Sequence, residues 1–263
     1  MNPISAILNN KKSKCALIPF ITAGYPSLKK SVQALFTLDN QGADIIELGI
    51  PYSDALADGP IIQESSKVAL EQGIYIDQVL NILEAVQFKL KAPIVIFTYY
   101  NPVLSRGVKR FIQEIVSSGA QGLLIPDLPV EETDYIISLC TYYKIELILF
   151  IAPTSSEKRI ELILLKSPGC IYLVSSCGVT GLRKELNSEI KNLVNIIKYR
   201  TNKLVILGFG ISNSVQANLV SKYNIDGIVI GSAFIKTISS SEHDDINDNL
   251  GSFCSKMKLS INS

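Results

Sequence analysis

The sequence predicts an α/β protein, a (β/α)8 TIM barrel in a single domain that spans residues 1–263. Short runs of β-branched and aliphatic residues recur eight times, and segments with helical spacing lie between them. This alternation over 263 residues is typical of a closed parallel barrel. The residues after the runs are rich in Gly, Pro, Asp, Ser and Thr, whereas those before them are ordinary. Because such barrels build their sites from the loops after the strands, we expect the active site at the carboxyl ends of the strands.

Each predicted strand is a short apolar run bounded by turn-forming residues, the pattern of a strand buried on both faces. The runs lie at residues 16–22, 44–50, 93–99, 122–126, 145–151, 170–176, 203–209 and 227–232. A doubly wound open sheet is the structural alternative. It fits less well, because no GxGxxG follows the first run and no change in composition marks a second domain.

Helical spacing is found between the runs. Residues 32–36 and 111–116 carry apolar side chains three and four positions apart. Residues 129–132 resemble the first turn of a helix, and Thr154 with Glu157 predicts a capping box. The longest connection, between the second and third runs, has room for an active-site loop before its helix.

The composition indicates a soluble globular protein. Hydrophobic residues make up 47% of the chain and charged residues 19%, and the net charge is +1. No global field therefore favours nucleic acid or a membrane as partner, and no apolar run is long enough to span a bilayer.

The cysteines and the amino terminus bear on the compartment. The five cysteines are an odd set without CxxC spacing, which favours reduced thiols. The first residues lack the apolar core of a signal peptide and the Arg-rich character of a transit peptide. The bias toward Ile, Asn, Lys and Ser suits an AT-rich genome. We therefore expect a cytoplasmic bacterial protein, or one of the plastid stroma if the gene is encoded in the organelle.

Residues 47–60, ELGIPYSDALADGP, place the carboxylates of Glu47 and Asp58 on either side of a Gly/Pro break that ends a predicted strand. Within that strand Ile46 and Leu48 share one face, while Glu47 and Gly49 share the other. If the larger apolar residues pack against an outer helix, Glu47 points into the barrel. An ionised carboxylate there requires a partner, a raised pKa or a catalytic task. A structural Glu paired with a buried Tyr or Arg is the alternative.

Three late loops predict a phosphate site. Residues 178–181, 208–211 and 231–234 offer small residues with exposed backbone amides, and Thr180 and Ser232 add hydroxyl groups. Glycine lets the main chain approach an anion closely, and a helix N-terminus adds a favourable dipole. Phosphate sites after the seventh and eighth strands recur in these barrels.

The sequence also limits the chemistry. The only histidine, His243, lies in a late polar stretch, which disfavours a His-ligated metal centre and a Ser-His triad. No lysine ends a predicted strand, which disfavours a Schiff-base aldolase. Acid–base chemistry by Glu47 and Asp58 remains, with the phenol of Tyr172 nearby, on a phosphorylated small molecule.

Four segments together resemble the tryptophan synthase α subunit family: ELGIPYSDALADGP, PDLPVEE, YLVSSCGVTG and GFGIS. LIPFITAGYP and TYYNP are also similar to that family's first and third strand ends, and the likeness spans nearly the whole chain. The resemblance implies a lyase that cleaves indole-3-glycerol phosphate to indole and glyceraldehyde 3-phosphate by acid–base catalysis. It implies no metal and no organic cofactor in this chain. It also implies a β subunit in an α2β2 heterotetramer, where pyridoxal phosphate serves to join indole to serine and form L-tryptophan.

The resemblance also assigns roles to residues of this sequence. Glu47 is expected to move the protons, and Asp58 to hold the indole N–H and stabilise growing positive charge. The other substrate-binding and interface positions are Phe20 and Tyr172 beside the indole, Thr180 and Gly181 in the sixth loop, Gly181, Gly210, Gly231 and Ser232 at the phosphate, and Asp54 and Asn101 toward the β subunit. Ala55 stands where the family often has Pro, so the second loop is expected to be less preorganised.

The sequence is also consistent with two other functions. A related phosphate-binding barrel that isomerises or epimerises sugar phosphates shares the late glycine loops. A non-catalytic sensor of an indole or a sugar phosphate is the alternative from another class. For Asp127, capping of the next helix and contact with substrate are equally supported, whereas Tyr99 and Tyr100 favour packing over ligand contact.

Overall fold

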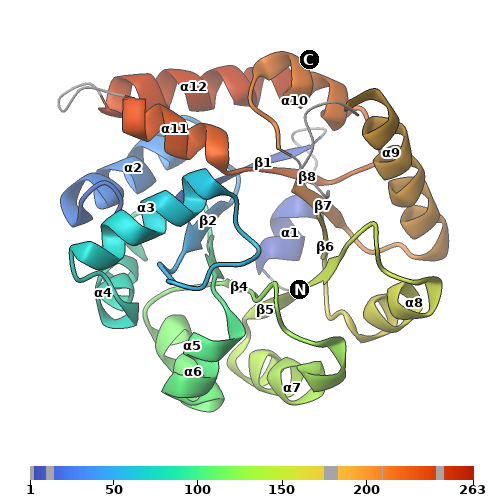
Figure 1. Ribbon diagram of the computed structural model, residues 1–263, viewed down its shortest axis with the longest axis horizontal. Coiled ribbons are helices and arrows are strands. Elements are labelled where there is room, and N and C mark those ends of the chain that lie inside the picture. The colour runs from blue at the N-terminus through green and yellow to red at the C-terminus, as the bar shows by residue number, and fades with distance from the viewer. Residues whose placement is uncertain (1–2, 10–14, 175–182, 209, 241–245) are drawn as a thin grey trace.

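The computed structural model describes residues 3–9, 15–174, 183–208, 210–240 and 246–263. Eight parallel strands close into a barrel in the order β1 to β8, and helices surround it as an outer ring (Figure 1). The strands are β1 Ala16–Thr22, β2 Ile46–Gly49, β3 Ile94–Phe97, β4 Gly122–Leu124, β5 Glu146–Ile151, β6 Ile171–Val174, β7 Val205–Gly208 and β8 Gly227–Ile230. The predicted single-domain (β/α)8 barrel is confirmed, and every predicted run contains its strand.

The helices bury apolar faces against the barrel. They are α2 Leu28–Asn40, α3 Pro60–Glu71, α4 Ile76–Val86, α5 Tyr100–Arg106, α6 Val108–Ser117, α7 Thr133–Tyr143, α8 Glu157–Lys166, α9 Arg183–Arg200, α10 Ser214–Ser221, α11 Ser232–Ser240 and α12 Ile246–Ile261. A 3-10 turn, Val130–Glu132, precedes α7. The long connection after β2 holds an extended loop and then two helices, α3 and α4.

The capping box predicted from Thr154 and Glu157 is wrong. The N-cap of α8 is Ser156, whose side chain accepts a hydrogen bond from the backbone N–H of Arg159. The helix therefore begins two positions later than a cap at Thr154 requires.

The short helix α1, Pro3–Asn9, covers the amino ends of the strands and lies within the ring in Figure 1. Its Ser5 donates from both backbone and side chain to the buried carboxylate of Glu146, at 3.0 and 2.6 Å. The backbone N–H of Cys170 donates to the same carboxylate at 2.9 Å. Glu146 thus ties α1 to the starts of β5 and β6, and the opposite end of the barrel is left for a site.

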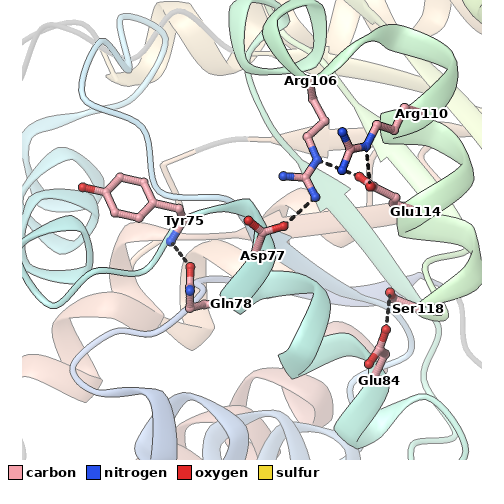
Figure 2. Close-up of polar contacts among 8 residues, drawn as sticks. All are labelled: Tyr75, Asp77, Gln78, Glu84, Arg106, Arg110, Glu114 and Ser118. Atoms are coloured by element: carbon pink, nitrogen blue, oxygen red, sulfur yellow. Dashed lines mark hydrogen bonds and ion pairs between the residues drawn. The ribbon is translucent and has the colours of Figure 1, made fainter.

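An ion-pair network fixes the helices that flank β3 (Figure 2). Arg106, the last residue of α5, pairs with Asp77 in the first turn of α4 and with Glu114 of α6. Arg110, which lies one turn before Glu114 on α6, pairs with the same carboxylate. Ion pairs at the surface contribute little stability singly, so the network serves mainly to link the ends of α4, α5 and α6.

Candidate active site

A cavity of about 850 Å³ opens at the carboxyl ends of the strands. Glu47, Asp58, Phe20, Tyr172, Gly210, Gly231 and Ser232 all line it. The structure therefore brings together, in one cavity, every described residue that the sequence assigned to catalysis or substrate binding. Thr180 and Gly181 lie outside the described residues.

Glu47 sits at the base of this cavity. It belongs to β2, pairs in register with Phe20 of β1 and Val95 of β3, and is 2% exposed. Burial, and secondly the negative charge of Asp58, raises the pKa of Glu47 to about 8. No hydrogen bond from a described tyrosine or arginine contributes to this pKa, so the alternative of a paired structural Glu gains no support.

Asp58 reaches the cavity from the loop that joins β2 to α3. Burial raises the pKa of its carboxyl group to about 6, and a hydrogen bond from the hydroxyl of Tyr99 at 2.9 Å acts in the opposite direction. The side-chain amide of Gln63 donates to the backbone carbonyls of Ala55 and Asp58, at 3.1 and 3.0 Å. The loop is therefore held at several points although Ala55 replaces a proline common in the resembled family.

Two aromatic side chains, Phe20 and Tyr172, line the cavity, and each lies over a glycine of the next strand. A β-carbon at Gly49 would come within 2.6 Å of the ring of Phe20. A β-carbon at Gly208 would come within 2.5 Å of the hydroxyl of Tyr172. Burial, with the charges of Glu47 and Asp58, raises the pKa of Tyr172 well above its ordinary value, so this phenol stays neutral.

The part of the cavity at the start of α11 has the features of an anion site. Gly231 immediately precedes α11, which begins at Ser232, and the backbone N–H of Ile235 already bonds to the carbonyl of Gly231. The first turn of α11 thus points its dipole toward the cavity. Lys236, one turn further along α11, also lines the cavity and is the one lysine or arginine among its described lining residues.

The residues assigned to a partner surface lie apart from this cavity. Asp54 and Asn101 are exposed and do not line it. The side-chain amide of Asn101 donates to the hydroxyl of Tyr52 at 3.3 Å, which connects the segment after β3 to the loop after β2. Asp127 accepts from the backbone N–H of Tyr100 at 2.8 Å and so caps α5, not the helix that follows Asp127 in sequence.

Sequence reasoning missed two residues of the site. Tyr99 was expected to pack, and it does, but its hydroxyl also contacts Asp58. The available signal was alternation, since Phe97 lines the cavity and Tyr99 lies two positions further along the chain. Lys236 is exposed on α11. The one signal for it in the sequence was its position four residues after Ser232, which places the two side chains on the same face of a helix.

The described residues give three further findings. No group of three or more His, Cys, Asp or Glu side chains among the described residues could hold a metal ion, and His243 lies outside them. The four cysteines in the described ranges, Cys15, Cys140, Cys170 and Cys254, are free and buried. Of the helices described, none is both long and apolar enough to cross a membrane.

The fold and the cavity define an eight-stranded parallel barrel whose pocket contains two carboxyl groups and the N-terminus of a helix that can bind an anion. A family profile described as "Tryptophan synthase alpha chain" matches residues 7–262. The chain belongs to this family and is therefore an enzyme subunit, a lyase. The resemblance noted from the sequence motifs is confirmed.

Individual relatives agree. A tryptophan synthase alpha chain from Gracilaria tenuistipitata var. liui is 62% identical over 99% of this chain and 97% of its own. One from Trichodesmium erythraeum is 45% identical, over 97% and 96% respectively. Among solved structures, the tryptophan synthase alpha subunit of Legionella pneumophila has a TM-score of 0.89 at 31% identity, with 99% of this chain and 98% of that chain covered. A Mycobacterium tuberculosis tryptophan synthase chain has a TM-score of 0.90 at 29% identity, with 100% and 99% covered.

Proposed function

We propose that this chain cleaves indole-3-glycerol phosphate to indole and glyceraldehyde 3-phosphate, and that Glu47 and Asp58 perform the chemistry. The observation that carries the proposal is the pair of carboxyl groups in one cavity, with the pKa of Glu47 raised to about 8 and that of Asp58 to about 6. At neutral pH the carboxyl group of Glu47 is therefore mainly protonated and that of Asp58 mainly ionised. Two carboxyl groups with separated pKa values divide acid and base roles between them.

Glu47 then acts as the general acid. It donates its proton to C3 of the indole ring, which becomes an indolenine cation and serves as the electron sink. The bond between C3 and the glycerol carbon breaks, its electrons return to the ring, and the hydroxyl on that carbon becomes a carbonyl. The proton released by this hydroxyl returns to the carboxylate of Glu47, so the residue ends the cycle as it began.

Asp58 stabilises the charge that develops in this step. Its carboxylate accepts a hydrogen bond from the indole N–H, and this interaction strengthens as the ring becomes positive. Phe20 and Tyr172 hold the flat ring between the walls of the cavity. The neutral phenol of Tyr172 adds no further negative charge beside Glu47.

The phosphate binds at the start of α11. The backbone at Gly210 and Gly231 and the hydroxyl of Ser232 face the cavity, and Thr180 and Gly181 are the further predicted contacts. Because the same cavity contains two carboxyl groups, a dianionic substrate also benefits from a cation. Lys236 supplies it from the same helix face as Ser232.

We further propose the remaining features that the family resemblance implies. The chain carries no metal or organic cofactor of its own and associates with a β subunit in an α2β2 heterotetramer, through a surface that includes Asp54 and Asn101. The β subunit uses pyridoxal phosphate to convert indole to L-tryptophan, and the complete enzyme is a carbon–oxygen lyase. Support for a partner that handles an amino-acid intermediate comes from two solved relatives, which are aminoacrylate-bound forms of tryptophan synthase from M. tuberculosis. The compartment, bacterial cytosol or plastid stroma, remains a prediction.

The test is release of indole from indole-3-glycerol phosphate by the purified chain, alone and with a β subunit. Glu47→Gln should keep the fold, judged by circular dichroism, and lower the rate at least roughly a hundredfold. Glu64→Gln is the matched control, because Glu64 is exposed on α3. Near-normal turnover by Glu47→Gln removes Glu47 from its role. Binding of substrate without cleavage, even with the β subunit, indicates the sensor instead, and turnover of a sugar phosphate alone indicates the isomerase.

A further inference from the structure

We propose that Tyr99 is a positioning residue that holds Asp58 in its ionised form and directs its carboxylate into the cavity. This inference rests on the function proposed for Asp58 above. Tyr99 does not line the cavity, so it acts through Asp58 and not on the substrate.

The hydroxyl of Tyr99 makes two hydrogen bonds to adjacent residues of the loop after β2. It accepts from the backbone N–H of Ala57 at 3.1 Å and donates to Oδ2 of Asp58 at 2.9 Å. Because the Ala57 amide can only donate, the phenol proton is left for the carboxylate. A single hydroxyl thus fixes the backbone just before Asp58 and the carboxyl group itself.

The ring of Tyr99 is held firmly enough to act as this anchor. The residue is 3% exposed, with the ring of Tyr52 at a centroid distance of 5.2 Å and that of Phe97 at 6.0 Å in an edge arrangement. The following residue, Tyr100, begins α5 and is capped by Asp127. A side chain held by both its ring contacts and its backbone loses little entropy when its hydroxyl bonds to a partner.

The electrostatic surroundings explain why Asp58 needs a donor. Burial raises the pKa of Asp58, and the Tyr99 hydrogen bond is the interaction that lowers it. Burial and the nearby Asp58 also raise the pKa of Tyr99, so the phenol keeps its proton. The other ionisable groups that face this region are Glu47 on β2, Tyr52 after β2, Tyr172 on β6, Asp127 after β4 and Lys236 on α11.

The decisive variant is Tyr99→Phe, which keeps the ring and removes only the hydroxyl. Loss of a hydrogen bond to an ionised group should lower kcat/KM for indole release roughly tenfold or more. It should also move the acidic limb of the pH–rate profile to higher pH, by about one pH unit, because the carboxylate loses a donor that favours its charged form. A merely structural role would lower activity without this shift.

The shift in the pKa of Asp58 can also be measured directly, without following the reaction. Titration of the Asp58 carboxyl carbon by 13C NMR should give a higher midpoint in Tyr99→Phe than in the unmodified chain. Tyr100→Phe is the matched control, since that hydroxyl donates to Glu132 at 2.8 Å and contacts neither Asp58 nor the cavity. Its midpoint and pH profile should be unchanged.

The outcomes separate this inference from the proposed function. An unshifted Asp58 midpoint in Tyr99→Phe overturns the positioning role, whatever the activity. A shifted midpoint in a chain that does not cleave indole-3-glycerol phosphate supports the hydrogen-bond role but overturns the function. If Tyr99→Phe unfolds at a much lower temperature than Tyr100→Phe and shows no shift, the residue is structural and the inference fails.

Discussion

The ring of Phe20 on β1 covers Gly49 on β2 so closely that a β-carbon at Gly49 would lie 2.6 Å from the ring's Cζ atom. Gly49 follows Glu47 by two residues on the same face of the strand, so Phe20 covers the position directly above the buried carboxyl group. The absence of a side chain at Gly49 therefore determines where the cavity wall stands.

Gly49→Ala should change substrate binding more than it changes the fold. The clash involves the outer end of a side chain, which can rotate away, so we expect a modest loss of stability of about 1–2 kcal/mol. The displaced ring no longer packs on the indole, and KM should rise roughly tenfold. Steady-state kinetics and thermal denaturation measure the two effects. Gly251→Ala on α12 is the control, because its nearest contacts are ordinary at 3.4 Å; an equal KM change in both variants would contradict the prediction.

The rate of indole release should have a bell-shaped pH dependence. Asp58 must be ionised, so activity is lost as the pH falls through about 6, the pKa to which burial raises it. Glu47 must be protonated, so activity is lost as the pH rises through about 8. The measurement is kcat/KM from about pH 5 to about pH 9.5, which reports the free enzyme. In Asp58→Asn the acidic limb should disappear, and a profile that is flat across pH 8 would show that Glu47 is not the acid.

Glu47 should lower the stability of the fold at alkaline pH. Its pKa is raised from the ordinary value of 4.5 to about 8 by folding, so its stabilising contribution is complete below pH 4.5 and is lost as the pH rises toward 8. Because glutamine does not ionise, Glu47→Gln should remove this decrease in stability with rising pH. At pH 8 the variant should exceed the unmodified chain in free energy of unfolding by about 1–3 kcal/mol, and the gap should close near pH 5. Denaturant titrations at both pH values test this, and a variant less stable at pH 8 would refute it.

The sequence predicted the barrel because each strand is a local pattern, a short apolar run between turn residues. It predicted the inward orientation of Glu47 for the same reason, since alternation along residues 44–50 is local. The roles of Tyr99, and of Gly49 and Gly208 beneath the aromatic rings, depend on contacts between different strands and loops. Tyr99 and Asp58 are 41 positions apart in sequence, and nothing local pairs them. The tie between Ser5 and Glu146 spans 141 positions and was not predicted either.

Lys236 should contribute to substrate affinity through charge. It is the one lysine or arginine among the described residues that line the cavity, and it lies one turn after Ser232 at the start of α11. Lys236→Met should raise KM for indole-3-glycerol phosphate roughly fivefold to tenfold, and kcat should change by less than about twofold, because the phosphate charge is the same before and after cleavage. The dependence of kcat/KM on ionic strength should also weaken, since a favourable long-range attraction has been removed.

The control is Lys222→Met. Lys222 is exposed at the end of α10, so this variant changes the net charge equally, but the residue does not line the cavity. If both lysine variants show the same KM and the same salt dependence, the attraction is a property of the whole surface and Lys236 has no particular role in holding the phosphate.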